Sequence, residues 1–112
     1  MGPTHAERLA AERERTVDQI EALRRSFDDI VAATEEVATD DEHDPEGHTI
    51  AWERQQVAAL LAAADARLGE LDDAVDRLAD GSYGRCEACG GSIAGERLEA
   101  LPTTTTCVTC AT

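Results

Sequence analysis

The sequence predicts a mainly α-helical chain in which a long antiparallel coiled-coil hairpin precedes a small C-terminal domain built around four cysteines. Two long segments carry apolar residues at alternating spacings of three and four, which is typical of helices that pair along a narrow seam. A short acidic segment separates them, and all four cysteines of the 112 residues follow the second one. We therefore expect a hairpin over residues 1–80 and a cysteine domain over residues 81–112.

The composition is strongly acidic, with ten Arg and Lys, 24 Asp and Glu, and a net charge of −14. High net charge with few large apolar residues is typical of disordered chains, but alanine supplies 20 residues, and the helical periodicity indicates long helices instead. The sequence contains no apolar stretch of about 18 residues and no signal-peptide-like N-terminus. We expect a soluble, cytoplasmic protein that does not bind membranes.

The first helix is expected over about residues 5–38. Its seam consists of Ile20, Leu23, Phe27, Ile30, Thr34 and Val37, with Leu9 and Val17 as looser extensions toward the N-terminus. An a/d stripe of this kind needs a partner helix to cover it.

The second helix is expected over about residues 46–80. Its seam consists of Ile50, Val57, Leu61, Ala64, Leu68, Leu71, Val75 and Leu78. The short connection predicts that the helices fold back antiparallel, and seams that cover each other favour a monomer. Gly81 suits the left-handed residue that ends a helix.

An acidic tip is expected around residues 39–47, where the hairpin turns. No Arg or Lys occurs between Arg25 and Arg54. A solvated loop is one explanation of the acids, and capping of the second helix explains Asp44 alone. Repulsion among the charges also favours a cationic partner, whereas phosphates of the same sign exclude direct nucleic acid binding. The candidate partner-binding residues are Asp40, Asp41, Glu42, Asp44 and Glu46.

The only tryptophan, Trp52, lies out of register with the seam from Ile50 to Val57. Two interpretations stay open, because an aromatic residue at this place can anchor a partner or flank the core.

The cysteines form two C-x2-C pairs, Cys86 with Cys89 and Cys107 with Cys110, separated by seventeen residues. Two such pairs deliver four thiolates to one tetrahedral zinc ion, and glycines beside the first pair allow the chain to curl around sulfur. Four protein ligands leave no open position on the metal, so we expect a structural Zn²⁺. Structural disulfides, rubredoxin-like iron and thiol redox chemistry are the weaker alternatives.

Residues around the cysteines share a pattern with a known family, namely Tyr83-Gly84-Arg85-Cys86-Glu87-Ala88-Cys89-Gly90, Ile93, Arg97-Leu98-Glu99-Ala100, Pro102 and Cys107-Val108-Thr109-Cys110. This pattern resembles the finger of the DksA/TraR family of bacterial transcription factors. The long hairpin with Asp44-Pro45 in its tip extends the resemblance over almost the whole chain. Within the finger, we expect Tyr83, Gly84 and Arg97 to be supporting residues.

The resemblance implies a protein that is not an enzyme and binds RNA polymerase. Family members insert the hairpin through the secondary channel and place acidic tip residues near the active site, which modulates initiation. Asp44 corresponds to the first tip aspartate, and the second acidic position falls near Glu46 or Gly47. Alarmone-responsive members carry basic residues where this chain has Glu70 and Leu101, so we expect weak or absent ppGpp binding.

A different class of function stays open beside the regulator. A zinc-stapled helical module could bind other proteins or sense redox conditions without any role at a polymerase, since fold does not fix function.

Overall fold

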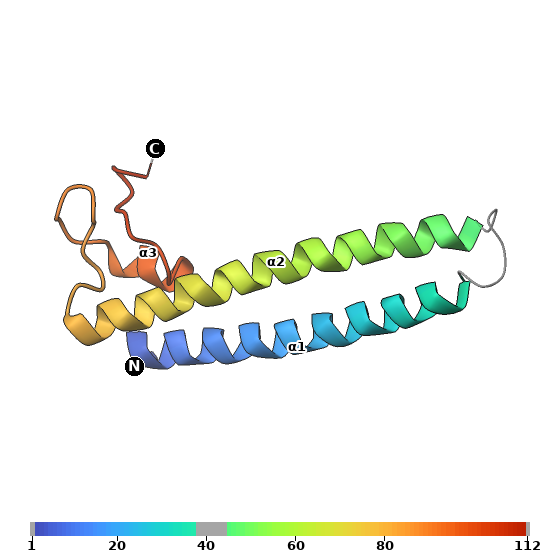
Figure 1. Ribbon diagram of the computed structural model, residues 1–112. Helices are drawn as coiled ribbons and strands as arrows, with labels where there is room; N and C mark the ends of the chain where they lie inside the picture. Colours follow the sequence, from blue (N-terminus) through green and yellow to red (C-terminus); the bar gives the residue numbers. More distant parts are fainter. Residues whose placement is uncertain (1, 38–44, 112) are drawn as a thin grey trace. The chain divides into compact units, whose positions relative to one another are not determined.

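A computed structural model describes residues 2–37 and 45–111, apart from the side chains of residues 34, 36, 37 and 45–48. It contains three helices in the described chain, α1 (His5–Val37), α2 (Pro45–Asp80) and α3 (Gly95–Ala100) (Figure 1). The predicted fold class is confirmed, since two long packed helices precede the cysteine segment. The observed helix ends lie within one residue of the expected ones.

The chain forms two compact units, each of which is described by itself. The first comprises Met1–Arg15 and Leu68–Thr112 and is called the finger unit. The second comprises Thr16–Arg67 and is called the hairpin unit. None of the described helices has the length and apolar character required to cross a bilayer.

The hairpin unit is held by a sparse seam between α1 and α2. Its buried residues are Thr16, Ile20 and Ala64, which are 4–5% exposed. The other described seam residues of this unit are only half-buried; they are Val17, Leu23, Phe27, Ile30, Ile50, Val57 and Leu61.

The finger unit packs more tightly. Leu9, Leu71 and Ala74 are completely buried and form one cluster, against which Leu78 and Tyr83 pack. The prediction of Val75 as a seam residue was wrong, since its side chain is 40% exposed and the neighbouring Ala74 is buried instead. Leu9 of α1 and Tyr83 after α2 pack on the side of the helix that carries Ala74, and these tertiary contacts, not the heptad spacing, decide which of the two residues is buried.

Local signals fix the helix ends in the finger unit. The Thr4 hydroxyl accepts a hydrogen bond from the Glu7 amide at 3.1 Å, and the Glu7 carboxylate accepts one from the Thr4 amide at 3.4 Å. This reciprocal pair is a capping box at the start of α1. At the end of α2, Gly81 adopts a φ of +86°, as predicted, and the Ser82 amide donates to the Arg77 carbonyl at 2.9 Å.

Candidate metal centre

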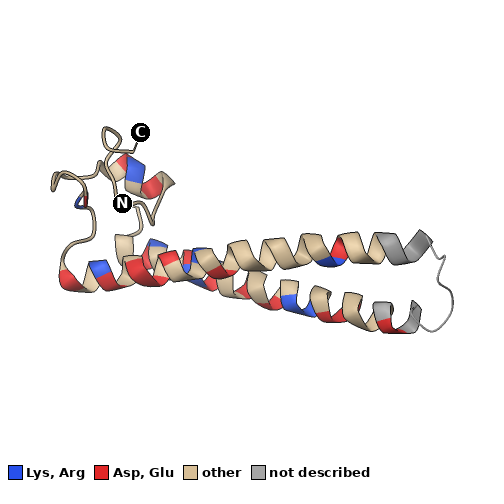
Figure 2. Cartoon of the chain, turned by 45° about the horizontal axis from the view of Figure 1, so that its top comes forward, with Lys and Arg blue, Asp and Glu red and all other residues tan. Residues whose placement is uncertain are grey.

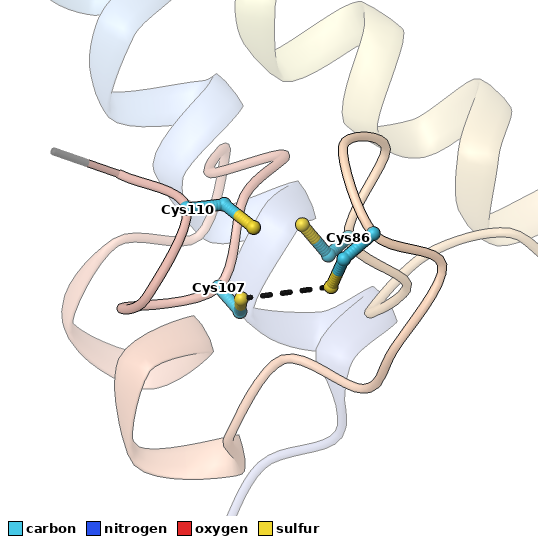
Figure 3. A group of neighbouring side chains, drawn as sticks. Cys86, Cys107 and Cys110 are labelled. Carbon is cyan, nitrogen blue, oxygen red and sulfur yellow. Dashed lines mark hydrogen bonds between the residues drawn. The ribbon is translucent and has the colours of Figure 1, made fainter.

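The four cysteines converge at one place in the finger unit. Their sulfur atoms all lie within 4.8 Å of one another. The labelled side chains of Cys86, Cys107 and Cys110 point toward a common centre in Figure 3. The cluster that the C-x2-C spacing predicts is therefore present.

The distances favour a metal over disulfides. The Sγ atoms of Cys89 and Cys107 are 3.9 Å apart, and all four cysteines are free. A disulfide needs an S–S distance of about 2.05 Å. Four sulfurs placed tetrahedrally at about 2.3 Å from zinc would be about 3.8 Å apart, close to the observed distance. The donor set thus fits one Zn²⁺, and a tetrathiolate shell makes that ion structural.

The first knuckle is shaped by its backbone. The Cys86 amide donates to the Gly91 carbonyl at 2.7 Å, and the Gly90 amide donates back to the Cys86 carbonyl at 2.8 Å. Gly90 has a φ of +74°, which side chains other than glycine rarely adopt. The Gly91 amide then points at the Cys89 sulfur, 3.4 Å away. The turn therefore directs backbone dipoles toward a sulfur that carries negative charge in the zinc-bound state.

The second knuckle is joined to the first through the backbone and through Arg97. The Glu87 amide donates to the Thr105 carbonyl at 2.9 Å. Arg97, on α3, donates through Nε to the Thr106 carbonyl at 2.9 Å and through Nη2 to the Thr104 hydroxyl at 3.3 Å. The Arg97 guanidinium thus holds the segment that leads into Cys107.

A small apolar core lies beside the sulfurs. Cys86, Ile93 and Leu98 are buried together, and Tyr83, Cys107 and Cys110 pack against them. Gly84 has a φ of +87°, and a Cβ added there would meet the Leu98 side chain at 3.5 Å. Leu98 and Ile93 were not singled out as supporting residues, although their positions in the family pattern carried the signal.

The electrostatics of the cluster suit a bound dication. Hydrogen bonds to backbone amides, that of Cys107 first and that of Cys89 next, lower the pKa of the Cys86 thiol to about 6. A backbone hydrogen bond at Cys110 is the main cause that lowers the pKa of Cys107. Hydrogen bonding with the sulfur of Cys107 and then with the other sulfurs raises the pKa of Cys110 to about 12. Four neighbouring sulfurs cannot all ionise unaided, and a divalent cation removes this penalty.

The finger is attached to both long helices within its unit. The Tyr83 hydroxyl donates to the Pro102 carbonyl at 2.8 Å, and its ring meets His5 edge-on with 5.1 Å between centroids. The Thr103 hydroxyl donates to the Glu70 carboxylate at 3.3 Å, so α2 also contacts the segment between the knuckles. His5 was not predicted, because its contact with Tyr83 joins distant parts of the sequence.

The structure describes no side chain of the predicted tip residues. Asp40, Asp41, Glu42 and Asp44 lie outside the described residues, and Glu46 is placed only as part of the backbone of α2. Their proposed role stays a prediction from the sequence.

Comparisons with known proteins agree with the geometry of the finger. Residues 81–112 match the family model described as the prokaryotic dksA/traR C4-type zinc finger. The structure of transcription factor DksA2 from Pseudomonas aeruginosa is similar over 90% of this chain and 78% of that one, with a TM-score of 0.57 and 25% sequence identity. The similarity therefore includes the two long helices as well as the finger.

Two curated relatives match shorter regions. The uncharacterized protein YteA of Bacillus subtilis (strain 168) is 37% identical over 71 residues, which are 63% of this chain and 30% of that protein. An uncharacterized protein of Aquifex aeolicus (strain VF5) is 46% identical over 46 residues, 41% of this chain and 32% of its own length. The chain thus spans about a third of the length of either relative.

Proposed function

With a DksA/TraR-family C4 zinc finger at residues 81–112 and a long helical hairpin before it, we propose that the chain regulates transcription by binding RNA polymerase. In this proposal the hairpin enters the secondary channel of the polymerase and its acidic tip modulates initiation. The observation that carries the proposal is the similarity to the transcription factor DksA2, which extends over 90% of the chain.

The paired helices suit a narrow channel. An α-helix with its side chains is about 10–12 Å wide, so two helices side by side can enter an opening that excludes a globular domain. The hairpin would act by position and charge, and the regulator would have no catalytic activity of its own.

The tip would supply the effect on transcription. Its candidate residues are Asp40, Asp41, Glu42, Asp44 and Glu46. Carboxylates at this place would act on basic or metal-bearing elements near the polymerase active centre. The same negative charge disfavours direct contact with nucleic acid.

The finger would serve as the docking element outside the channel. Zinc, Arg97 and Tyr83 hold its loops rigid, and its contacts with α1 and α2 fix the ends of both helices. A rigid base lowers the entropic cost of presenting the hairpin to a partner.

This chain has no basic residue at the two positions where alarmone-responsive relatives carry cations. Glu70 is a carboxylate in contact with Thr103, and Leu101 is apolar and 49% exposed. Recognition of a tetra-anionic nucleotide depends on charge-assisted hydrogen bonds. Calorimetry on the complex of this chain with polymerase should therefore give weak or no ppGpp binding, and micromolar binding would contradict this expectation.

The primary test is binding of the zinc-loaded chain to bacterial core RNA polymerase, with and without a known secondary-channel factor as competitor. Saturable binding that the competitor removes supports the proposal. Binding that the competitor does not reduce, or no binding, argues against insertion in the channel.

A variant of the tip tests its role separately. Asp44→Asn should abolish the effect on transcription while leaving binding intact; loss of both would make Asp44 a helix cap or an anchor.

A second candidate, a redox-sensing interaction module, is favoured by the exposed side chain of Cys89. An accessible thiolate is the form that peroxide oxidises. Mild peroxide should then release zinc at a rate that excess zinc slows, whereas a polymerase regulator would copurify with core enzyme under reducing conditions.

A further inference from the structure

The hairpin unit has a groove that neither the zinc centre nor the tip explains. It has a volume of about 500 Å³ and lies between α1 and α2. From α1 it is lined by Ser26, Asp29 and Ile30, and from α2 by Trp52, Glu53, Gln56 and Val57. All of its lining residues belong to the hairpin unit.

Trp52 is the unusual feature of this groove. Its side chain is 62% exposed, although tryptophan is the largest side chain and the only one of its kind in the sequence. This exposure argues against the interpretation of Trp52 as a flank of the core, because a ring so exposed contributes little to the core. An exposed aromatic residue at the rim of a groove is typical of an anchor for a partner.

The charged residues that line the groove are all acidic. Asp29 and Glu53 are its only charged lining residues, and both side chains are exposed. Neither carboxylate has a recorded ion pair within the part of the chain that the structure describes. Arg25 and Arg54, the nearest cations in the sequence, are not among the lining residues. Figure 2 marks the acidic positions in red and the basic positions in blue along the two long helices.

We propose that this groove binds an arginine side chain presented by a partner protein. The guanidinium would stack on the Trp52 ring, where a cation is attracted by the negative face of the aromatic system. Its N–H groups would donate to the carboxylates of Asp29 and Glu53. The aliphatic stem of the arginine would lie along Ile30 and Val57, both half-buried.

Other occupants fit the lining less well. An apolar helix would have to remove two carboxylates from water without supplying partners, which is costly. Nucleic acid would be repelled by them. A second copy of this chain, with a net charge of −14, would meet long-range repulsion. Lysine is more strongly hydrated than arginine and lacks the planar group that stacks on an indole ring.

This inference does not depend on the polymerase being the partner, and its test can be made without one. Three capped, alanine-based helical peptides that differ only in a central arginine, lysine or citrulline are titrated into the zinc-loaded full chain. Because Trp52 is the only tryptophan, its fluorescence reports occupation of the groove directly. We expect a saturable change with the arginine peptide, at least threefold weaker binding of the lysine peptide, and at least tenfold weaker binding of the citrulline peptide.

Variants distinguish specific binding in the groove from general electrostatic attraction to an acidic protein. Calorimetry should show about threefold weaker binding of the arginine peptide to Trp52→Leu, and about tenfold weaker binding to a double variant with Asp29→Asn and Glu53→Gln. Asp18→Asn with Glu35→Gln removes the same charge from exposed positions of α1 outside the groove, so it is the matched control. Equal losses in the two double variants, equal binding of the citrulline peptide, or no response from Trp52 would overturn the proposal.

Discussion

In the finger unit, Leu9, Leu71 and Ala74 are completely buried, whereas the hairpin unit has no described side chain as well enclosed as these three. Large apolar side chains of the hairpin unit, Trp52 and Leu60, are 62% and 52% exposed. The finger unit also has four convergent sulfurs and a second apolar cluster at Cys86. The comparison shows a division in packing: the tightly enclosed clusters lie in the finger unit, although exposed large apolar side chains, Leu101 and Val108 among them, occur there as well.

Zinc removal should produce the largest difference in stability between the two units. Metal binding of a structural finger is worth about 10–16 kcal/mol at neutral pH and is coupled to folding. We expect a strong chelator, or Cys86→Ser, to abolish amide protection over residues 81–111 while most of the protection in the hairpin unit persists. Hydrogen exchange measured by NMR checks this result. Val108→Ala, in the second knuckle but 70% exposed, is the control that should retain zinc. Equal loss of protection in both units would refute the division.

Truncation of a leucine to alanine should also destabilise the protein more in the finger unit than in the hairpin unit, but by less than zinc removal. Leu71→Ala removes a fully buried side chain and should lower the free energy of unfolding by about 2–5 kcal/mol. Leu61→Ala, at a half-buried position of the hairpin unit, should cost less. Urea denaturation compares them, with the exposed Leu60→Ala as a control within about 0.5 kcal/mol of the parent. A larger loss at Leu61 than at Leu71 would reverse the order that burial predicts.

The capping box should contribute less to stability than the buried Leu71 side chain. Thr4→Ala removes the acceptor of the Glu7 amide and should destabilise the start of α1 by about 1 kcal/mol. Since the first turns of α1 carry His5 and Leu9, which belong to the finger unit, the effect should appear in the amide exchange of that unit. Thr4→Ser keeps the hydroxyl and should restore most of the stability. Loss of stability in Thr4→Ser as large as in Thr4→Ala would show that the methyl group, rather than the cap, matters.

The smallest predicted effect is a pH dependence at the end of α2. Asp80 accepts hydrogen bonds from the Ser82 hydroxyl at 2.6 Å and from the Ser82 amide at 2.9 Å, and these lower the pKa of its carboxyl group. A lowered folded-state pKa means that this stabilisation is present above the unfolded value of about 3.9 and is lost as the pH falls through the folded value.

Thermal unfolding of Asp80→Asn against the parent should accordingly show a difference in Tm near neutral pH that shrinks in acid. Asp76→Asn, an exposed aspartate one turn earlier, controls for loss of charge. A difference between Asp80→Asn and the parent that stays constant with pH would contradict the hydrogen-bonding argument.

The sequence allowed most of the fold to be predicted because its strongest signals are local. The spacing of the cysteines predicts the sulfur cluster, since two C-x2-C turns need little from the rest of the chain. Alternating apolar spacings predict α1 and α2. The Thr4 to Glu7 capping box is also a local pattern and could have been recognised.

The sequence prediction was wrong or incomplete where contacts between distant parts of the chain determine the structure. Val75 and Ala74 are both apolar neighbours on α2, and only the direction of the Leu9 and Tyr83 contacts determines that Ala74 is buried. The contact between His5 and Tyr83 joins the first turn of α1 to the start of the finger. The groove at Trp52 needs both helices in register, so the sequence left the role of Trp52 open.

The proposal that the hairpin enters the secondary channel of RNA polymerase can be examined by site-specific cross-linking. A photoreactive amino acid placed at Asp41 of the zinc-loaded chain should cross-link to polymerase segments that line the channel, and a secondary-channel competitor should remove these products. Cross-links confined to the outer surface of the enzyme, or products that the competitor leaves unchanged, would contradict the claim.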